Sequence, residues 1–481
     1  MDQPTAPASR KTIRFERILI RGSWRHDVDV GVGADGTIVS TTPTEEAQHS
    51  STTAPETVRG WTVPGLANVH SHSFQRALVG LAEKGGQNSF WRWREVMYDF
   101  LLRLGPEDVE AVASQLFMEL LKGGFTTVGE FHYLHHQPGG RPYEDPSELS
   151  RRIISAANRT GIALVHIPVV YETAGFDGAP LEGGQQRFHM DVDSLAELTG
   201  TVAADLAAAG SGSEAANHSV GWGLHSLRAT SEATVADAAQ AFAGATGYPV
   251  HIHVAEQIKE VEGCEAARGA RPIEWLVDHA DVSPNWCLIH ATHSTQQERV
   301  QMATSGAAVG LCPTTEANLG DGLFSLPDYL DATGHFGVGT DSHVGRTVAG
   351  ELRCLEYGQR LTLRERGVTM PLADLGADAQ GVGGALFSRA ARGGARALGR
   401  ACGEVATGLR ADFVVLDPEA ASLFGRTGPE VLDSWIFSGD VSPVRDVMVG
   451  GHWVIQNGHH AKEEAILATF RERVDGLSKR L

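Results

Sequence analysis

The stretch Val63-Pro-Gly-Leu-Ala-Asn-Val-His-Ser-His72 indicates both the fold and the chemistry of this chain. Its apolar residues up to Val69 predict a buried strand, and two histidines two positions apart follow. Side chains at i and i+2 of a strand point to the same side, so both imidazoles can face one metal ion. In a chain with 21 histidines such a pair also arises by chance, so its weight depends on the residues downstream.

Further metal-type residues follow short apolar runs later in the chain. They are His253-Val-Ala-Glu256, His290 and Gly339-Thr-Asp341. A parallel barrel carries its chemistry at such strand ends. Three imidazoles and one carboxylate suit a divalent ion, zinc being the first expectation, with one coordination position left for water. The pattern therefore predicts a metal-assisted hydrolase rather than a binding module.

Strand and helix patterns alternate through the middle of the chain, from residue 64 to 398. Eight predicted strands end near His70, Glu130, Val170, His225, Val254, His290, Leu311 and Asp341. The intervals, such as 106–122 and 232–246, are long enough for helices. This alternation predicts a (β/α)8 TIM-like barrel in the α/β class. The insert at 75–104 follows the first strand, and long loops at a barrel mouth are often lids.

Both ends of the chain carry β patterns instead. Strand-like runs cover 13–20, 28–32, 37–39, 412–416, 444–449 and 453–455. They predict a small β-sandwich domain built from both chain termini, residues 1–63 and 399–481, with a C-terminal amphipathic helix over 463–481. The barrel domain is then 64–398.

The overall composition limits the partners and the compartment. The chain has 481 residues, is 42% hydrophobic and has a formal charge of −19, which argues against nucleic-acid or anionic-membrane binding. No run reaches the roughly 20 apolar residues that span a bilayer, and Met1–Arg10 has no signal-peptide core. The five cysteines are dispersed, so we expect reduced thiols and a cytoplasmic protein.

The spacing suggests acid–base roles but leaves alternatives open. Glu256, three residues after His253, can take a proton from water and deliver it to a leaving nitrogen; alternatively it is an acid that stabilises a helix N-terminus. His251 competes with His253 as a ligand, and we prefer His253 because of Glu256. Asp341 could bind metal, orient the water or do both. His290 could be a ligand or lie just outside the ligand shell.

A missing lysine favours one metal ion over two. Two-metal sites of this layout need a bridging group, often a carboxylated lysine at strand four. That strand ends in Gly223-Leu-His-Ser-Leu-Arg228, which contains none. The lysines of the middle region are Lys84, Lys122 and Lys259, and none reads as a strand-end residue.

Taken together, the motifs resemble the deaminase-like branch of the amidohydrolase superfamily over almost the whole chain. The segments that carry the resemblance are Asn68-Val-His-Ser-His-Ser-Phe-Gln-Arg-Ala77, Ser89-Phe-Trp-Arg-Trp-Arg-Glu95, Glu130-Phe-His-Tyr133, Gly223-Leu-His-Ser-Leu-Arg228 and His251-Ile-His-Val-Ala-Glu-Gln257. The second and third resemble members that hydrolyse N-formimino-L-glutamate to N-formyl-L-glutamate and ammonia in histidine degradation.

The resemblance implies a role for each matching residue. One Zn2+ per chain, or Fe2+ or another divalent metal, would be bound by His70, His72, His253 and Asp341. Glu256 would be the proton shuttle, His290 would assist the water with Asp341, and His225 would contact the formimino group. The substrate carboxylates would be held by Arg94, Tyr133 and Arg228, with Gln75 a further contact. The histidines left unassigned, as surface or loop residues, are His132, His135 and His136.

Other functions remain open at this stage. Deaminases of the same branch that act on guanine, cytosine or adenosine-type compounds share the metal set. A non-catalytic scaffold of this fold would be expected to lose metal ligands, and a two-metal cyclic-amide hydrolase is disfavoured by the missing lysine. The implied partner is a small molecule with two carboxylates, which suits arginine. Related barrels are often homodimers, but the sequence shows no interface signal.

Overall fold

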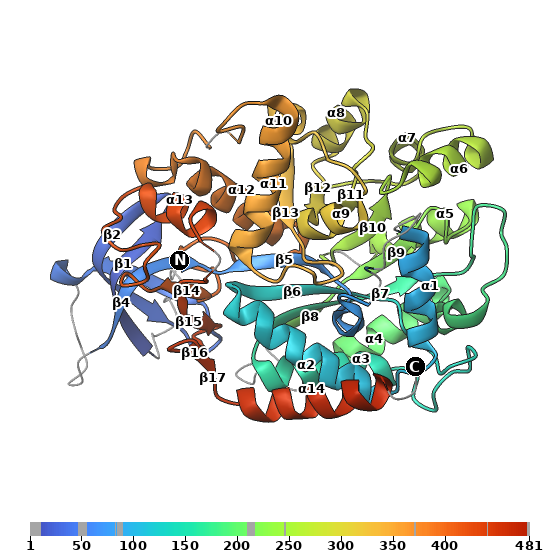
Figure 1. The fold of residues 1–481 in the computed structure, drawn as a ribbon, viewed down its shortest axis with the longest axis horizontal. Coiled ribbons are helices and arrows are strands. Elements are labelled where there is room, and N and C mark those ends of the chain that lie inside the picture. The colour runs from blue at the N-terminus through green and yellow to red at the C-terminus, as the bar shows by residue number, and fades with distance from the viewer. Residues whose placement is uncertain are drawn as a thin grey trace, which may run out of the picture.

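The computed structural model describes residues 11–46, 55–81, 83, 90–208, 217–244, 247–369, 372–439 and 441–478. These residues form a parallel barrel and a separate sheet of terminal strands (Figure 1). The predicted fold class, a (β/α)8 TIM-like barrel with a small β-sandwich domain built from both chain termini, is thereby confirmed, with the described terminal strands paired in one sheet. Met1–Arg10, for which the sequence predicts no signal peptide, lies outside the described residues.

The barrel strands pair in parallel, and the β6–β7 pairing closes the ring. They are β5 (Leu66–Ser71), β6 (Phe125–His132), β7 (Ala163–Val170), β9 (Trp222–Ser226), β10 (Val250–Val254), β11 (Trp286–His290), β12 (Ala308–Leu311) and β13 (His335–Val338), with the short β8 (His218–Val220) beside β7. Because helices cover the outside, these strands are buried on both faces and read as apolar runs. The eight predicted strand ends fall within three residues of the observed ones.

Helices connect the strands and surround the barrel (Figure 1). They are α2 (Pro106–Lys122), α3 (Glu148–Thr160), α4 (Val192–Ala208), α5 (Glu232–Gly244), α6 (Ile258–Arg268), α7 (Pro272–His279), α8 (Gln296–Ser305), α9 (Pro313–Leu319), α10 (Leu326–Asp331), α11 (Val348–Leu363) and α12 (Val382–Ala397). The predicted helix 106–122 coincides with α2, which starts at a proline, has acids in its first turn and is capped by Gly123.

The insert after the first strand contains the 3-10 helix η2 (Ser73–Leu78) and α1 (Phe90–Leu101). Residues 82 and 84–89, and the side chains of 90–92, lie outside the described part, so the motif beginning at Ser89 is described only in part. The end of the insert is tied down by the buried Arg187, which donates to the carbonyls of Leu101 and Leu104. Arg187 belongs to the 3-10 helix η3 (Gly183–Phe188).

Strands from both termini form one eight-stranded sheet in the order β17-β16-β15-β14-β4-β1-β2-β3. Their bounds are β1 (Lys11–Ile20), β2 (Ser23–Val32), β3 (Ile38–Pro43), β4 (Glu56–Pro64), β14 (Phe413–Leu416), β15 (Val444–Val449), β16 (His452–Gln456) and β17 (His459–His460). Gly65 alone separates β4 from barrel strand β5, and a Cβ there would lie 2.1 Å from Thr126 Oγ1. We propose domain boundaries at 63/64 and 398/399, as the sequence suggests.

The remaining helices are α13 (Glu430–Phe437) and the C-terminal α14 (Glu463–Ser478). Although α14 was predicted as part of the terminal domain, it lies along barrel helix α2 (Figure 1). Lys122 Nζ of α2 is 2.5 Å from Glu463 Oε1 of α14. Among the described residues, no helix is both long and apolar enough to cross a membrane.

Helix α12 packs so closely on strand β13 that one glycine cannot be replaced without strain. A Cβ at Gly393 would lie 1.8 Å from the carbonyl oxygen of Phe336. We expect Gly393→Ala to lower the free energy of unfolding by about 1–3 kcal/mol or more, because backbone must shift. Gly200, at an exposed position of α4, has nothing within 4 Å of its Cβ position. There the same change should stabilise by roughly 0.5–1 kcal/mol; denaturant unfolding of both variants checks the contrast, and equal effects would contradict it.

Candidate active site

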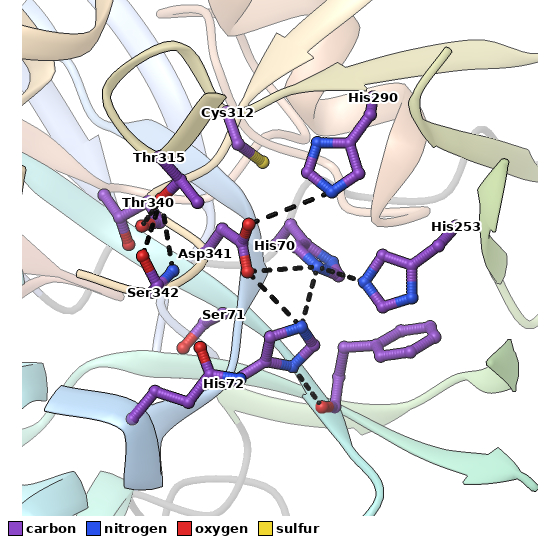
Figure 2. A network of polar contacts seen from close by, with 12 residues as sticks. His70, Ser71, His72, His253, His290, Cys312, Thr315, Thr340, Asp341 and Ser342 are labelled. Atoms are coloured by element: carbon purple, nitrogen blue, oxygen red, sulfur yellow. Dashed lines mark hydrogen bonds and ion pairs between the residues drawn. The ribbon is translucent and has the colours of Figure 1, made fainter. Parts of the chain in front are cut away.

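Three imidazoles and one carboxylate converge at the C-terminal ends of the barrel strands (Figure 2). His70 Nε2 lies 3.1 Å from His72 Nε2 and 2.9 Å from His253 Nε2. Asp341 Oδ1 is 3.4 Å from His72 Nε2 and 3.8 Å from His70 Nε2. The four side chains proposed as metal ligands from the sequence are therefore brought together, although they come from three strands far apart in the chain.

The hydrogen bonds of these histidines show why the cluster fits a cation. His72 Nδ1 lies 2.9 Å from the Phe131 carbonyl, and His253 Nδ1 lies 2.8 Å from the His225 carbonyl. A carbonyl only accepts, so both Nδ1 atoms carry the proton and both Nε2 atoms present lone pairs. Burial lowers the pKa of His72 to about 3 and that of His253 well below its ordinary value, which keeps both neutral. Lone pairs aimed at one buried point match a metal ion, with the backbone carbonyls fixing the rings.

Local sequence explains how the first and last strands meet here. The Asn68 amide donates to Thr340 Oγ1 at 2.7 Å, and its oxygen accepts from the Thr340 N–H at 3.1 Å. Between them, Gly339 passes so close to β5 that a Cβ would lie 2.8 Å from His70 Cβ. Asn68 and Gly339 thus hold the loop of Asp341 against the His70 strand.

Left-handed backbone is concentrated around the same site. The non-glycine residues with positive φ at these strand ends are Ala255 (52°), His290 (67°), Ala291 (49°), Asp341 (45°) and His343 (68°). Such conformations cost about 1–3 kcal/mol each and persist where the surroundings fix them, most often in active sites. The strain agrees with the placing of the candidate site at this end of the barrel.

His290 and Glu256 flank the four side chains of His70, His72, His253 and Asp341, here called the metal-type cluster. His290 Nε2 is 3.8 Å from both Asp341 Oδ2 and Glu256 Oε1, and its Nδ1 is 3.2 Å from Glu316 Oε1. Burial opposes protonation of His290, but Glu256, Glu316 and Asp341 outweigh it and raise its pKa to about 10. Burial raises the pKa of Asp341 to about 7, although the nearby His290 opposes that shift. His290 lies between the carboxylate of the cluster and that of the predicted proton shuttle.

His251 faces away from the cluster. Its Nε2 lies 2.8 Å from the carbonyl of Ala397, the last residue of α12. His251 and His253 are two residues apart on β10, but it is His253 Nε2 that reaches the cluster, 2.9 Å from His70 Nε2. The geometry thus supports the preference for His253 as ligand.

A cavity opens from the cluster and contains every predicted substrate-binding residue. Its walls include Gln75, Arg94, Tyr133, His225 and Arg228, together with Glu256, His290 and Asp341. The Gln75 amide donates to the Tyr133 hydroxyl at 2.8 Å. The His225 ring contacts those of Tyr171 and His253, with centroids 4.4 and 4.9 Å apart.

The two arginines give this cavity a local positive charge in an acidic protein. Arg94 donates to the Tyr98 hydroxyl, and Arg228 Nη1 donates to the Ala174 carbonyl at 3.4 Å. Burial raises the pKa of the Tyr171 hydroxyl, but the charges of Arg228 and Arg94 outweigh burial and the net shift is downward. The cavity can therefore hold anionic groups beside these two arginines.

The structure also reveals residues that the sequence did not single out for the site. Glu130 accepts from Ser71 Oγ at 2.5 Å and from the Ser73 N–H at 2.8 Å, which fixes the turn that carries His72. Glu316 fixes His290, and Tyr98 and Tyr171 lie beside the arginines. Only Glu130 stood in a quoted motif; the others follow no local pattern. His132 and His135, read as surface or loop residues, are buried, and His136 is half-buried.

Comparison with known proteins defines the class. The model of the amidohydrolase family matches residues 61–454, and the chain belongs to that family. The formimidoylglutamate deiminase of Pseudomonas aeruginosa is 45% identical over 457 residues, covering 95% of this chain and 97% of that protein.

Solved structures support the same class. A crystal structure of an amidohydrolase from Brucella melitensis has a TM-score of 0.87 at 41% identity, covering 97% of this chain and 100% of that one. An adenosine deaminase from Xanthomonas campestris with bound zinc shares the fold, with a TM-score of 0.78 at 22% identity over 99% of this chain and all of that chain.

Proposed function

We propose that this protein hydrolyses N-formimino-L-glutamate to N-formyl-L-glutamate and ammonia, a step of histidine degradation. The observation that carries the proposal is one cavity that joins the metal-type cluster and Glu256 to two arginines, Arg94 and Arg228. A substrate with a reactive formimino group for the cluster and Glu256, and two carboxylates for the arginines, matches this arrangement. The name of the Pseudomonas aeruginosa relative agrees with that substrate.

The metal proposed for the cluster is one zinc ion per chain, held by His70, His72, His253 and Asp341. When bound, such an ion makes a water molecule acidic enough to attack near neutral pH, with a pKa of about 7. In the described part of the chain no lysine lies at the end of β9, which agrees with a single ion; Lys84 lies outside that part. A homodimer remains a prediction.

Each residue of the site then has its own role in the reaction. Glu256 removes a proton from the attacking water and passes it to the imino nitrogen. The water oxygen bonds to the formimino carbon as the C=N double bond becomes single. Glu256 then passes the remaining proton of that oxygen to the same nitrogen, and the carbon–nitrogen bond breaks so that ammonia leaves as the formyl C=O forms. His290 and Asp341 orient the water, while His225 contacts the formimino group. Arg94, Arg228 and Tyr133 hold the carboxylates, with Gln75 supporting Tyr133.

The test is ammonia release from N-formimino-L-glutamate by the purified chain, with bound metal counted in the same sample. Ammonia and N-formylglutamate in equal amounts, at about one metal ion per chain, are expected. Bound metal without ammonia would overturn the substrate while keeping the hydrolase site. Guanine and cytosine analogues would then be assayed.

The arginines make a separate prediction about substrate binding. Replacing both Arg94 and Arg228 by methionine should raise KM for N-formimino-L-glutamate about 10²-fold or more, because each charge-assisted hydrogen bond contributes about 1.5–3 kcal/mol. The matched control is Arg366→Met, which removes an exposed arginine outside the cavity. Steady-state kinetics of the three proteins decide; an unchanged KM in the double variant would remove the arginines from the substrate site.

A further inference from the structure

Glu260, in the first turn of α6, holds the backbone of the proposed proton shuttle. The Ala255 N–H donates to Glu260 Oε1 at 3.0 Å, and the Glu256 N–H donates to Glu260 Oε2 at 3.0 Å. Both carboxylate oxygens are therefore used on two consecutive peptide groups. This two-point contact fixes both the position and the orientation of the backbone at Glu256.

The arrangement differs from ordinary capping of a helix. In a capping box, the acid at the third helical position accepts from the N–H of the residue that caps the helix. Here that residue is Gln257, which α6 follows, and Glu260 reaches past it to the two residues before. The contact thus serves the segment between β10 and α6 rather than the helix end.

That segment has a backbone which needs support. Ala255 has a left-handed φ of 52°, and its short side chain makes no hydrogen bond that could compensate. Its N–H is held by Glu260, and its carbonyl accepts from the His293 N–H at 3.0 Å. The left-handed residue turns the chain directly before Glu256, so its conformation decides where the Glu256 carboxylate points.

Glu260 interacts electrostatically with charged residues that line the cavity. Burial first and the nearby Glu256 second raise the pKa of Glu260 to about 7, although Arg228 and the two backbone donors oppose that shift. Glu260 itself also lines the cavity wall, beside Glu256. It is thus in electrostatic contact with both the shuttle and a proposed carboxylate-binding arginine.

We propose that Glu260 is a positioning residue, whose carboxylate holds Ala255 and Glu256 in the conformation needed for proton transfer. The inference rests on the proposed function, because it assigns Glu260 an effect on the step that Glu256 performs. A purely structural role would instead lower stability and leave the kinetic constants of the folded enzyme unchanged. The two roles are distinguished by kcat and KM.

The test is Glu260→Gln, which keeps the length of the side chain but replaces one acceptor oxygen by an amide donor. One of the two N–H groups then loses its partner. We expect kcat for ammonia release to fall about 10- to 100-fold, less than or equal to the low end of the roughly 10²–10⁴-fold that acid–base catalysis contributes, because the shuttle is displaced and not removed. KM should stay within about threefold and metal content should stay unchanged, because the metal and the carboxylates are bound by other groups. The matched control is Glu262→Gln, the same change at an exposed position of α6, which should leave kcat unchanged.

Glu260→Asp is the second variant, for the case in which the glutamine variant does not fold. It keeps the charge and both oxygens but is one methylene shorter, so it cannot reach both N–H groups, and kcat should again fall while KM holds. A wild-type kcat in either folded variant, or a fall in kcat that follows loss of metal, overturns the inference alone. A wild-type enzyme that releases no ammonia from N-formimino-L-glutamate overturns the proposed function and this inference with it.

Discussion

Replacement of Glu256 by glutamine is expected to lower kcat for ammonia release by about 10³-fold, within the range that acid–base catalysis contributes. The physical reason is that the amide has nearly the shape of the carboxylate but cannot accept a proton from water. Glu256 lines the cavity beside the cluster, with Oε1 3.8 Å from His290 Nε2, and is not among the proposed metal ligands. Metal content should therefore stay at the wild-type level.

The measurement pairs steady-state kinetics with metal analysis of the same preparation. Glu262→Gln serves as control here as well, because it makes the same chemical change at an exposed position. Retained turnover in Glu256→Gln would remove Glu256 as the shuttle. Loss of turnover together with loss of metal would mean that Glu256 helps to hold the ion instead.

Removal of the metal is expected to have the other largest effect, abolishing turnover and lowering the melting temperature. Without an ion, the lone pairs of His72 Nε2 and His253 Nε2 both lie about 3 Å from His70 Nε2. That nitrogen has at most one proton to donate, so it cannot satisfy both contacts. An ion that binds only the folded state at about 1,000 times its Kd contributes about 4 kcal/mol. Chelation followed by zinc should lower and then restore both activity and Tm. Activity that survives complete removal of metal would contradict the assignment.

Two neighbouring histidines provide a matched pair of variants for this prediction. His253→Ala should lose the metal, because His253 Nε2 points into the cluster. His251→Ala removes another buried imidazole of the same strand, but one that bonds to the Ala397 carbonyl. It should destabilise the fold yet retain the metal. The opposite outcome would reverse the choice between these two residues.

Much of the fold was predictable because the barrel strands are apolar runs bounded by polar strand ends. The first strand was expected to end near His70 and ends at Ser71. The last was expected to reach Asp341, but β13 ends at Val338, because the chain turns at Gly339 to pass His70. The position of α14 was not predictable, since its amphipathic pattern requires a partner without identifying it, and that partner is α2.

Part of the candidate site was likewise predictable from the sequence, and part of it was not. His70 and His72 share a strand face by their spacing, and Glu256 follows His253 by three residues, so local sequence was enough to suggest both pairs. The position of His290 beside Glu256 was not predictable in this way. His290 is held by Glu316, which lies on another βα unit. No spacing relates those residues.

The sequence by itself determined the kinds of ligand, their order on the strand ends and the alternation that closes the barrel, because each depends on residues a few positions apart. Only the tertiary structure decided that His253 rather than His251 faces the cluster, that Arg94 and Arg228 share its cavity, and that Glu260 holds Glu256. These depend on contacts between segments whose relative positions are set by the packing of the whole barrel.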